Sequence, residues 1–101
     1  MAERLRWSLK AADNLEEICS FIEQDNPAAA RDLARNLFQL ANDIPDYPLM
    51  GRVVPEFGVF EIRERILSPY RMVYRVKNET VEILAIRHSA RRFPTLDKLM
   101  E

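Results

Sequence analysis

The most constraining feature of the sequence is the run Tyr70-Arg71-Met72-Val73-Tyr74-Arg75-Val76, bounded by Ser68-Pro69 and Lys77-Asn78-Glu79. It is rich in aromatic and β-branched residues, which favour strands. Because side chains alternate along a strand, one face takes the four large apolar side chains, and the other takes both arginines with Val73. The run therefore predicts a strand with a core on one face. Its second face must accommodate two guanidinium groups.

Two amphipathic helices are predicted before this strand. From Leu9 to about Gln24, apolar residues recur at steps of three and four, the period of a helix with one buried face. Ser8 suits the N-cap of this helix. Asn26 can cap a second helix with Pro27 at its first position, where the missing N–H has no intrahelical partner, and this helix ends near Asp43. The short connection predicts an antiparallel helical hairpin.

Three further strands are predicted around these elements. Residues 3–7 alternate polar and apolar side chains, and residues 59–67 and 80–87 have strand patterns on either side of the central run. Glu64 falls in the apolar row of the second of these strands, which predicts a bulge or an edge position. Asn78 tolerates a positive φ and predicts a tight hairpin between the last two strands.

The predicted order is β-α-α-β-β-β, an α+β fold in which the helical hairpin packs on an antiparallel sheet. Residues 46–58 contain Pro48, Gly51 and Pro55 and are expected to form a loop. The length suits one domain over residues 1–101 with a C-terminal tail from residue 93. The tail either forms one or two helical turns from Thr95 or frays.

The charge is unevenly distributed. Residues 1–60 hold six basic and ten acidic side chains, whereas residues 61–92 hold eight basic and four acidic ones. The basic segment is therefore where we expect an anionic partner to bind. No apolar run approaches the roughly 20 residues that span a bilayer, and no signal segment opens the chain. A cytoplasmic location without membrane contact is expected.

Basic residues of the last three strands and of the turn beyond them form the candidate site. Arginine binds phosphate or carboxylate through a planar pair of donors and stays charged at biological pH. We expect the following residues to converge on one concave patch: Arg63, Arg65, Arg71, Arg87, His88, Arg91 and Arg92. The alternative is that these arginines pair on the surface with Glu61, Glu64 and Glu82.

Metal and cofactor sites are not expected. The single histidine, His88, could act as a general acid or base, or could be a hydrogen-bonded structural residue at a strand end. The single cysteine, Cys19, lies in an apolar helical stripe and is expected to be a buried thiol. One histidine and one distant cysteine do not make a zinc site, and the two glycines form no phosphate-binding loop.

Several motifs occur in a characteristic order between residue 3 and Pro94. They are Trp7-Ser8 followed by Ala12…Leu15-Glu16-Glu17-Ile18, Asn26-Pro27-Ala28-Ala29-Ala30, Pro48-x-Met50-Gly51-Arg52, the central run from Tyr70 to Val76, and Ile83-Leu84-x-Ile86-x-His88-x-Ala90-Arg91. With this order and spacing, the sequence resembles the RelE/ParE superfamily of bacterial toxins from type II toxin–antitoxin modules, on its ParE-like side. The resemblance implies the fold described above, a role in plasmid stabilisation, and a cognate antitoxin, ParD-like or similar. In such a hetero-oligomer the antitoxin's C-terminal segment covers the toxin's groove and basic surface.

The superfamily divides in its activity. RelE-like members cut messenger RNA inside the ribosome with a basic set and a C-terminal tyrosine. The resemblance places Arg71 and Arg91 at two of the basic positions, with His88 as a further catalytic candidate. The two lysine positions of the preceding strand fall near Ile62 and Glu64, and no tyrosine follows Tyr74.

ParE-like members instead inhibit DNA gyrase by protein contact without chemistry of their own. Because the tyrosine is missing, the resemblance favours this activity, with no intrinsic catalysis and with the seven basic-segment residues as the target-binding surface. The alternatives are a ribosome-dependent mRNA endoribonuclease and a non-toxic antitoxin-binding co-repressor.

Overall fold

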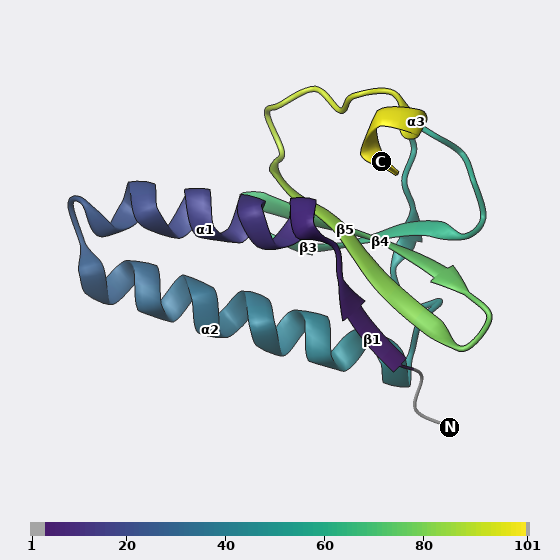
Figure 1. Ribbon diagram of the computed structural model, residues 1–101, viewed down its shortest axis with the longest axis horizontal. Coiled ribbons are helices and arrows are strands. Elements are labelled where there is room, and N and C mark those ends of the chain that lie inside the picture. Colours follow the sequence, from purple (N-terminus) through teal and green to yellow (C-terminus); the bar gives the residue numbers. More distant parts are fainter. Residues whose placement is uncertain (1–3, 101) are drawn as a thin grey trace.

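The computed structural model describes residues 4–100 and contains a helical hairpin beside one five-stranded sheet (Figure 1). The elements are β1 (Arg4–Trp7), α1 (Leu9–Glu23), α2 (Pro27–Asp43), the 3-10 turn η1 (Ile44–Asp46), β2 (Arg52–Val53), β3 (Ile62–Leu67), β4 (Tyr70–Lys77), β5 (Thr80–His88) and α3 (Leu96–Leu99). The strand order is β1-β5-β4-β3-β2. The predicted α+β fold is confirmed.

Both long helices begin at the predicted caps. The Ser8 Oγ accepts a hydrogen bond from the N–H of Ala11 at 3.0 Å, and the Asn26 Oδ1 accepts one from the N–H of Ala29 at 3.0 Å. Pro27 occupies the first turn of α2, as expected. Since only three residues separate the helices, they pack side by side as a hairpin, which extends past the sheet at the end away from β1 (Figure 1).

The sheet is antiparallel except where β1 joins it. A two-residue turn with Asn78 at φ 58° connects β4 and β5, which confirms the predicted hairpin. β1 pairs with β5 in parallel, Leu5 lying opposite Val81. Nearly the whole chain separates these two strands, so no short turn restricts their relative direction.

The irregularity of the sheet lies in β5. The pairing with β4 shifts between Val73 and Tyr74, which leaves Leu84 as the extra residue. Leu84 and Ala85 therefore both pack on the face of the sheet that α3 covers, and Ile86 returns to the face of the helical hairpin. The strict alternation expected along residues 80–87 is wrong from Ala85 onward, because a bulge advances every later side chain by one position.

Three other expectations for the second half of the chain need correction. The β3 strand begins at Ile62, not at Val59, and its register with β4 is continuous. Glu64 is neither bulged nor at an edge, since it pairs with Arg52 of β2 on one side and with Val73 of β4 on the other. The predicted loop at residues 46–58 begins at the last residue of η1 and contains β2, and both elements are too short for periodicity to reveal.

Apolar side chains fill both sides of the sheet. One cluster lies between the sheet and the helical hairpin and includes Leu37, Met72 and Tyr74. The other lies between the sheet, the segment after β2 and α3, where Leu99 is 1% exposed. Of the two alternatives for the tail, the helical turn is thus the one observed. No helix among residues 4–100 has both the length and the apolarity needed to cross a membrane.

Candidate functional site

The structure separates the predicted basic surface into distinct groups. Arg65 lies opposite Met72, which packs against the helices, whereas Arg71 lies opposite Ile66 on the other face. Directly opposed residues of an antiparallel pair share a face, so the arginines of β3 and the arginine of β4 point to opposite sides. The expectation of one concave patch containing all seven residues is wrong, because the register between β3 and β4 divides them.

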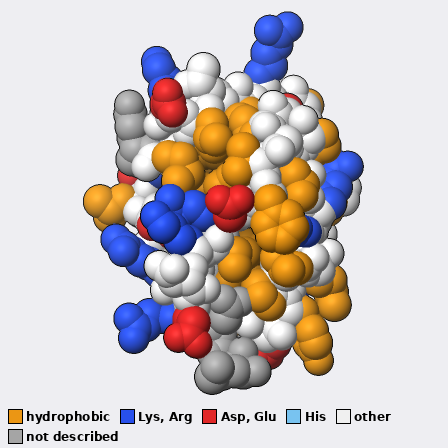
Figure 2. Space-filling view, turned by 90° about the vertical axis from the view of Figure 1, so that its right-hand side faces the viewer, with side chains coloured by type: hydrophobic (Ala, Val, Ile, Leu, Met, Phe, Trp, Pro, Cys, Tyr) orange, Lys and Arg blue, Asp and Glu red, His pale blue; other side chains and the backbone are white. Residues whose placement is uncertain are grey.

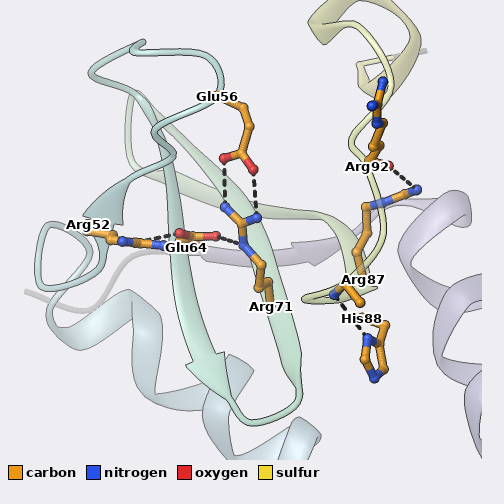
Figure 3. Close-up of polar contacts among 8 residues, drawn as sticks. Arg52, Glu56, Glu64, Arg71, Arg87, His88 and Arg92 are labelled. Atoms are coloured by element: carbon orange, nitrogen blue, oxygen red, sulfur yellow. Dashed lines mark hydrogen bonds and ion pairs between the residues drawn. The ribbon is translucent and has the colours of Figure 1, made fainter.

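Arg71 lies at the centre of a buried ion-pair network (Figure 3). Its Nη1 and Nη2 each donate to one carboxylate oxygen of Glu56 at 2.8 Å, and its Nε donates to the Glu64 Oε1 at 2.6 Å. The other oxygen of Glu64 accepts from the Arg52 Nε at 2.6 Å. The guanidinium of Arg71 also lies 4.4 Å from the ring centre of Phe93.

The charges of this network balance. Two arginines face two carboxylates, and Arg71 is 8% exposed while Glu64 is 1% exposed. The hydrogen bonds from Arg71 lower the pKa of Glu56 to about 2, and those carboxylates raise the pKa of Arg71. Each guanidinium edge of Arg71 is occupied, which leaves no donor pair for an external phosphate.

Of the three glutamates in the alternative expectation, only Glu64 pairs with a candidate arginine, Arg71, and this pair is buried, whereas Glu82 pairs with arginines outside the candidate set. Glu64 pairs as described above, and Glu82 lies 3.7 Å from Arg6 and 3.4 Å from Arg75. Glu61 takes part in none of the ion pairs found among residues 4–100.

Arg63 stabilises the segment before β3. Its Nε donates to the carbonyl of Phe60 at 3.1 Å, and its Nη1 donates to the carbonyls of Leu49 and Gly51 at 3.2 and 2.9 Å. The guanidinium also lies 4.6 Å from the ring centre of Phe60. Since its acceptors are backbone carbonyls, its positive charge has no counter-ion among the residues that the structure describes. Arg63 thus holds the loop while keeping a net charge on the surface.

A pocket of about 470 Å³ lies between α1 and the end of β5. It is lined by Asn14, Glu17, Ile18, Phe21, Tyr70, Ile86, Arg87, His88 and Arg91. Three of the predicted residues, Arg87, His88 and Arg91, are therefore brought together here. Arg92 contributes its carbonyl, which accepts from the Arg87 Nη2 at 2.7 Å (Figure 3).

The polar side chains at this pocket differ in whether their nitrogen atoms have hydrogen-bond partners. The Arg87 Nε is buried and has no hydrogen-bond partner among the described residues, and burial beside Arg91 lowers the pKa of Arg87. The Nδ1 of His88 accepts a hydrogen bond from the N–H of Ala90 at 3.1 Å. Its ring lies edge-on to the ring of Tyr70, with 5.8 Å between the two ring centres. The structural role considered for His88 therefore has two contacts to support it.

Sequence reasoning missed several residues that shape these sites. Glu56 and Phe93 reach Arg71 from segments far from β4, and no local pattern marks them. Asn14 did leave a signal, since it is a polar residue on the inner stripe of α1, three positions after Ala11 and four before Ile18. Its Oδ1 accepts a hydrogen bond from the N–H of Ile86 at 3.1 Å. Asn14 thus provides an acceptor for a backbone N–H of β5 that lies beyond the end of β1.

Metal-binding side chains do not assemble within the part of the chain that the structure describes. No group of three His, Cys, Asp or Glu residues with that geometry occurs there. Cys19 is half-buried, not fully buried as expected, and burial raises the pKa of its thiol, as does nearby Glu23.

Comparison with known sequences gives a consistent family. The model of the ParE toxin of the type II toxin–antitoxin system parDE matches residues 5–93. A Sinorhizobium fredii protein named as a toxin, Y4kP, is 33% identical over 91% of this chain and 94% of its own. Toxin RelE2 of Caulobacter vibrioides is 34% identical over 84% of this chain and 93% of its own.

Solved structures share the fold at lower identity. The chromosomal ParDE system of P. aeruginosa contains a chain with a TM-score of 0.73 and 23% identity, covering 86% of this chain and 96% of that one. A chain of the RelBE2 complex of Mycobacterium tuberculosis has a TM-score of 0.63 and 20% identity, covering 87% of this chain and 99% of that one. A mutant of the E. coli toxin RelE in the free state has a TM-score of 0.63 and 15% identity, covering 89% of this chain and 86% of that one.

Proposed function

The chain belongs to the ParE toxin family of type II toxin–antitoxin systems, and we propose that it inhibits DNA gyrase by protein contact and is neutralised by a cognate antitoxin. This proposal assigns the toxic effect to a bound surface and no covalent step to the chain.

The state of Arg71 is the single observation that carries the proposal. An endoribonuclease stabilises the charge that develops on a phosphoryl group with donors aimed at that position. The resemblance places Arg71 at that position, and here each of its three guanidinium nitrogens donates to Glu56 or Glu64, while Phe93 covers its face. No tyrosine follows Tyr74 in the sequence to supply a proton. These features favour protein contact over RNA cleavage.

The surface is suited to extensive contact with another polypeptide. Large apolar side chains are exposed on both helices, on the loop after η1 and around β3: Leu9, Phe21, Phe38, Tyr47, Leu49, Met50, Phe60 and Ile66. Figure 2 shows one such side of the molecule, where apolar side chains form a broad band bordered by basic ones. Exposed apolar area of this kind marks interaction surfaces.

A cognate antitoxin is the first partner that we propose for this surface. Two of the structural neighbours come from toxin–antitoxin systems, the ParDE system and the RelBE2 complex. By analogy we propose a hetero-oligomer in which a ParD-like or similar polypeptide covers the exposed side chains.

Expression of the chain without antitoxin tests the target. We expect DNA breaks and a DNA-damage response, and we expect the purified chain to trap cleaved DNA in a gyrase supercoiling reaction. Rapid translation arrest with transcripts cut at the ribosome would contradict the proposal in favour of the endoribonuclease. Harmless overexpression with tight antitoxin binding would select the co-repressor.

A further inference from the structure

We propose that the pocket between α1 and the end of β5 is the site where the antitoxin inserts a carboxylate beside an apolar side chain. The inference rests on the proposed function, because it names how the neutralising polypeptide would be recognised. The pocket is large enough, at about 470 Å³, for side chains of a partner segment rather than for a whole element.

The pocket has one apolar and one cationic side. Ile18 and Phe21 of α1 face it from one side, and Ile86 contributes from β5. Phe21 is 74% exposed, so most of its ring is available to a partner. Aromatic side chains that lose their water on binding are frequent anchors of protein interfaces.

The cationic side lacks an internal counter-ion. Arg87 has one hydrogen bond to a backbone carbonyl, at 2.7 Å, and its buried Nε has no acceptor within the described residues. None of the ion pairs found among residues 4–100 involves Arg87 or Arg91. Arg71, on the neighbouring strand, has three hydrogen bonds to two carboxylates instead.

This difference indicates an incomplete site. The guanidinium of Arg87 lies 5.6 Å from the ring centre of Phe93 and donates through Nη2, but its buried Nε loses hydration that no acceptor among residues 4–100 replaces. A carboxylate is the group that fits its planar donors, and at the Nε of Arg87 it would match the arrangement that Glu64 provides for the Nε of Arg71. Burial and the nearby charge of Arg91 lower the pKa of Arg87, which agrees with a guanidinium that has no carboxylate partner among residues 4–100.

A polypeptide fits the pocket better than a nucleic acid does. Glu17 also lines it, and a chain of phosphates would bring repeated negative charge close to that carboxylate. A single acidic side chain can instead lie at Arg87 while its apolar neighbour in sequence packs on Phe21. The mixture of charges and apolar surface thus selects an acidic and apolar segment.

The test is the affinity of the chain for the polypeptide encoded by the adjacent reading frame, measured by titration calorimetry. We expect Arg87→Gln to weaken binding at least tenfold and Phe21→Ser to weaken it at least fivefold. Arg31→Gln, which removes an exposed arginine of α2 that does not line the pocket, is the matched control and should stay within twofold. Phe21→Ser changes an exposed side chain, so it probes the pocket even if Arg87→Gln fails to fold.

Charge-neutralising substitutions of the partner's acidic residues then identify the carboxylate. One of them should cost the same factor as Arg87→Gln, with no further loss when the two are combined. Tight binding that neither Arg87→Gln nor Phe21→Ser alters, or an equal loss with Arg31→Gln, would overturn the inference and leave the proposed function standing. Absence of any complex with the unaltered chain would contradict the proposed function as well. Binding of a single-stranded RNA oligonucleotide that depends on Arg87 would overturn the choice of a polypeptide.

Discussion

The Nε of Arg71 lies 2.6 Å from the Oε1 of Glu64, and this ion pair between β4 and β3 is almost completely buried. Both side chains occupy the face of the sheet that the C-terminal tail covers. Each has a second charged partner, Glu56 for Arg71 and Arg52 for Glu64, so neither charge is left unbalanced. Arg71, which the sequence predicts as part of a basic surface, thus belongs to an internal ion-pair network.

Removing the buried carboxylate should therefore be costly. We expect Glu64→Ala to lower the free energy of unfolding by about 3 kcal/mol, because it leaves the buried guanidinium of Arg71 with one carboxylate partner in place of two. Urea denaturation followed by circular dichroism measures this loss. Glu61→Ala is the control, since Glu61 is exposed, and it should change stability by less than about 0.5 kcal/mol. A loss below about 1 kcal/mol for Glu64→Ala would show that the ion pair is not buried in solution.

Acid should protonate Glu56, the second carboxylate of the network, and so weaken its ion pair with Arg71. The pKa of Glu56 is lowered from 4.5 to about 2 by its hydrogen bonds with Arg71, so its contribution to stability is complete above pH 4.5 and is lost as the pH falls towards 2. Because the Glu56 side chain is 42% exposed, solvent screening limits this contribution to about 1 kcal/mol.

Glu56→Gln tests this pH dependence. We expect the variant to be less stable than the original chain at pH 7 and to match it near pH 2, in thermal unfolding across that range. A stability difference that stays constant with pH would contradict the depressed pKa of Glu56 and point to lost packing instead.

The C-terminal turn should behave as part of the core. Leu99 is 1% exposed in the cluster between α3 and the sheet, so Leu99→Ala should reduce the free energy of unfolding by about 2 to 3 kcal/mol. Leu9→Ala, at a side chain that is 84% exposed, provides the same chemical change without a cavity and should have little effect. Equal stability of both variants in urea denaturation would mean that the tail does not pack in solution.

The amide of Asn14 should stabilise β5 beyond the end of β1. Asn14→Ala removes the acceptor for the N–H of Ile86, and we expect a loss of about 1 to 2 kcal/mol. Asn36→Ala on the exposed side of α2 controls for the better helix propensity of alanine. Hydrogen exchange of the Ile86 amide provides a local readout, and unchanged protection in Asn14→Ala would refute this role.

Much of the fold follows from local patterns. Ser8 and Asn26 cap the helices because their oxygens reach the unpaired N–H groups of the first turn, and this requires no distant residue. Asn78 adopts a positive φ for an equally local reason. The bulge at Leu84 was not predictable in this way, since Ala85 and Ile86 are both apolar and fit either face of the strand.

The candidate site depended more strongly on tertiary structure. Arg87, His88 and Arg91 were predicted to lie together and do so, because they are close in sequence around one strand end. Arg65 and Arg71 were expected to join them, but the β3–β4 register places these two on opposite faces. Arg71 does lie opposite Arg87 in the β4–β5 pairing, but Glu56 and Glu64 neutralise its charge. The acidic partner Glu56 comes from a loop whose course no pattern defines.

The sequence by itself determined where the two long helices and the four longer strands form, where most of them end, and which toxin family the chain resembles. Those properties depend on side-chain periodicity and on capping groups within a few positions of each other. Only the tertiary structure decided which arginines are neutralised and which remain without a counter-ion. That outcome depends on strand register and on contacts such as the one between Arg71 and Phe93, which lie 22 positions apart in the chain, because a charge is stabilised by whatever lies near it in space.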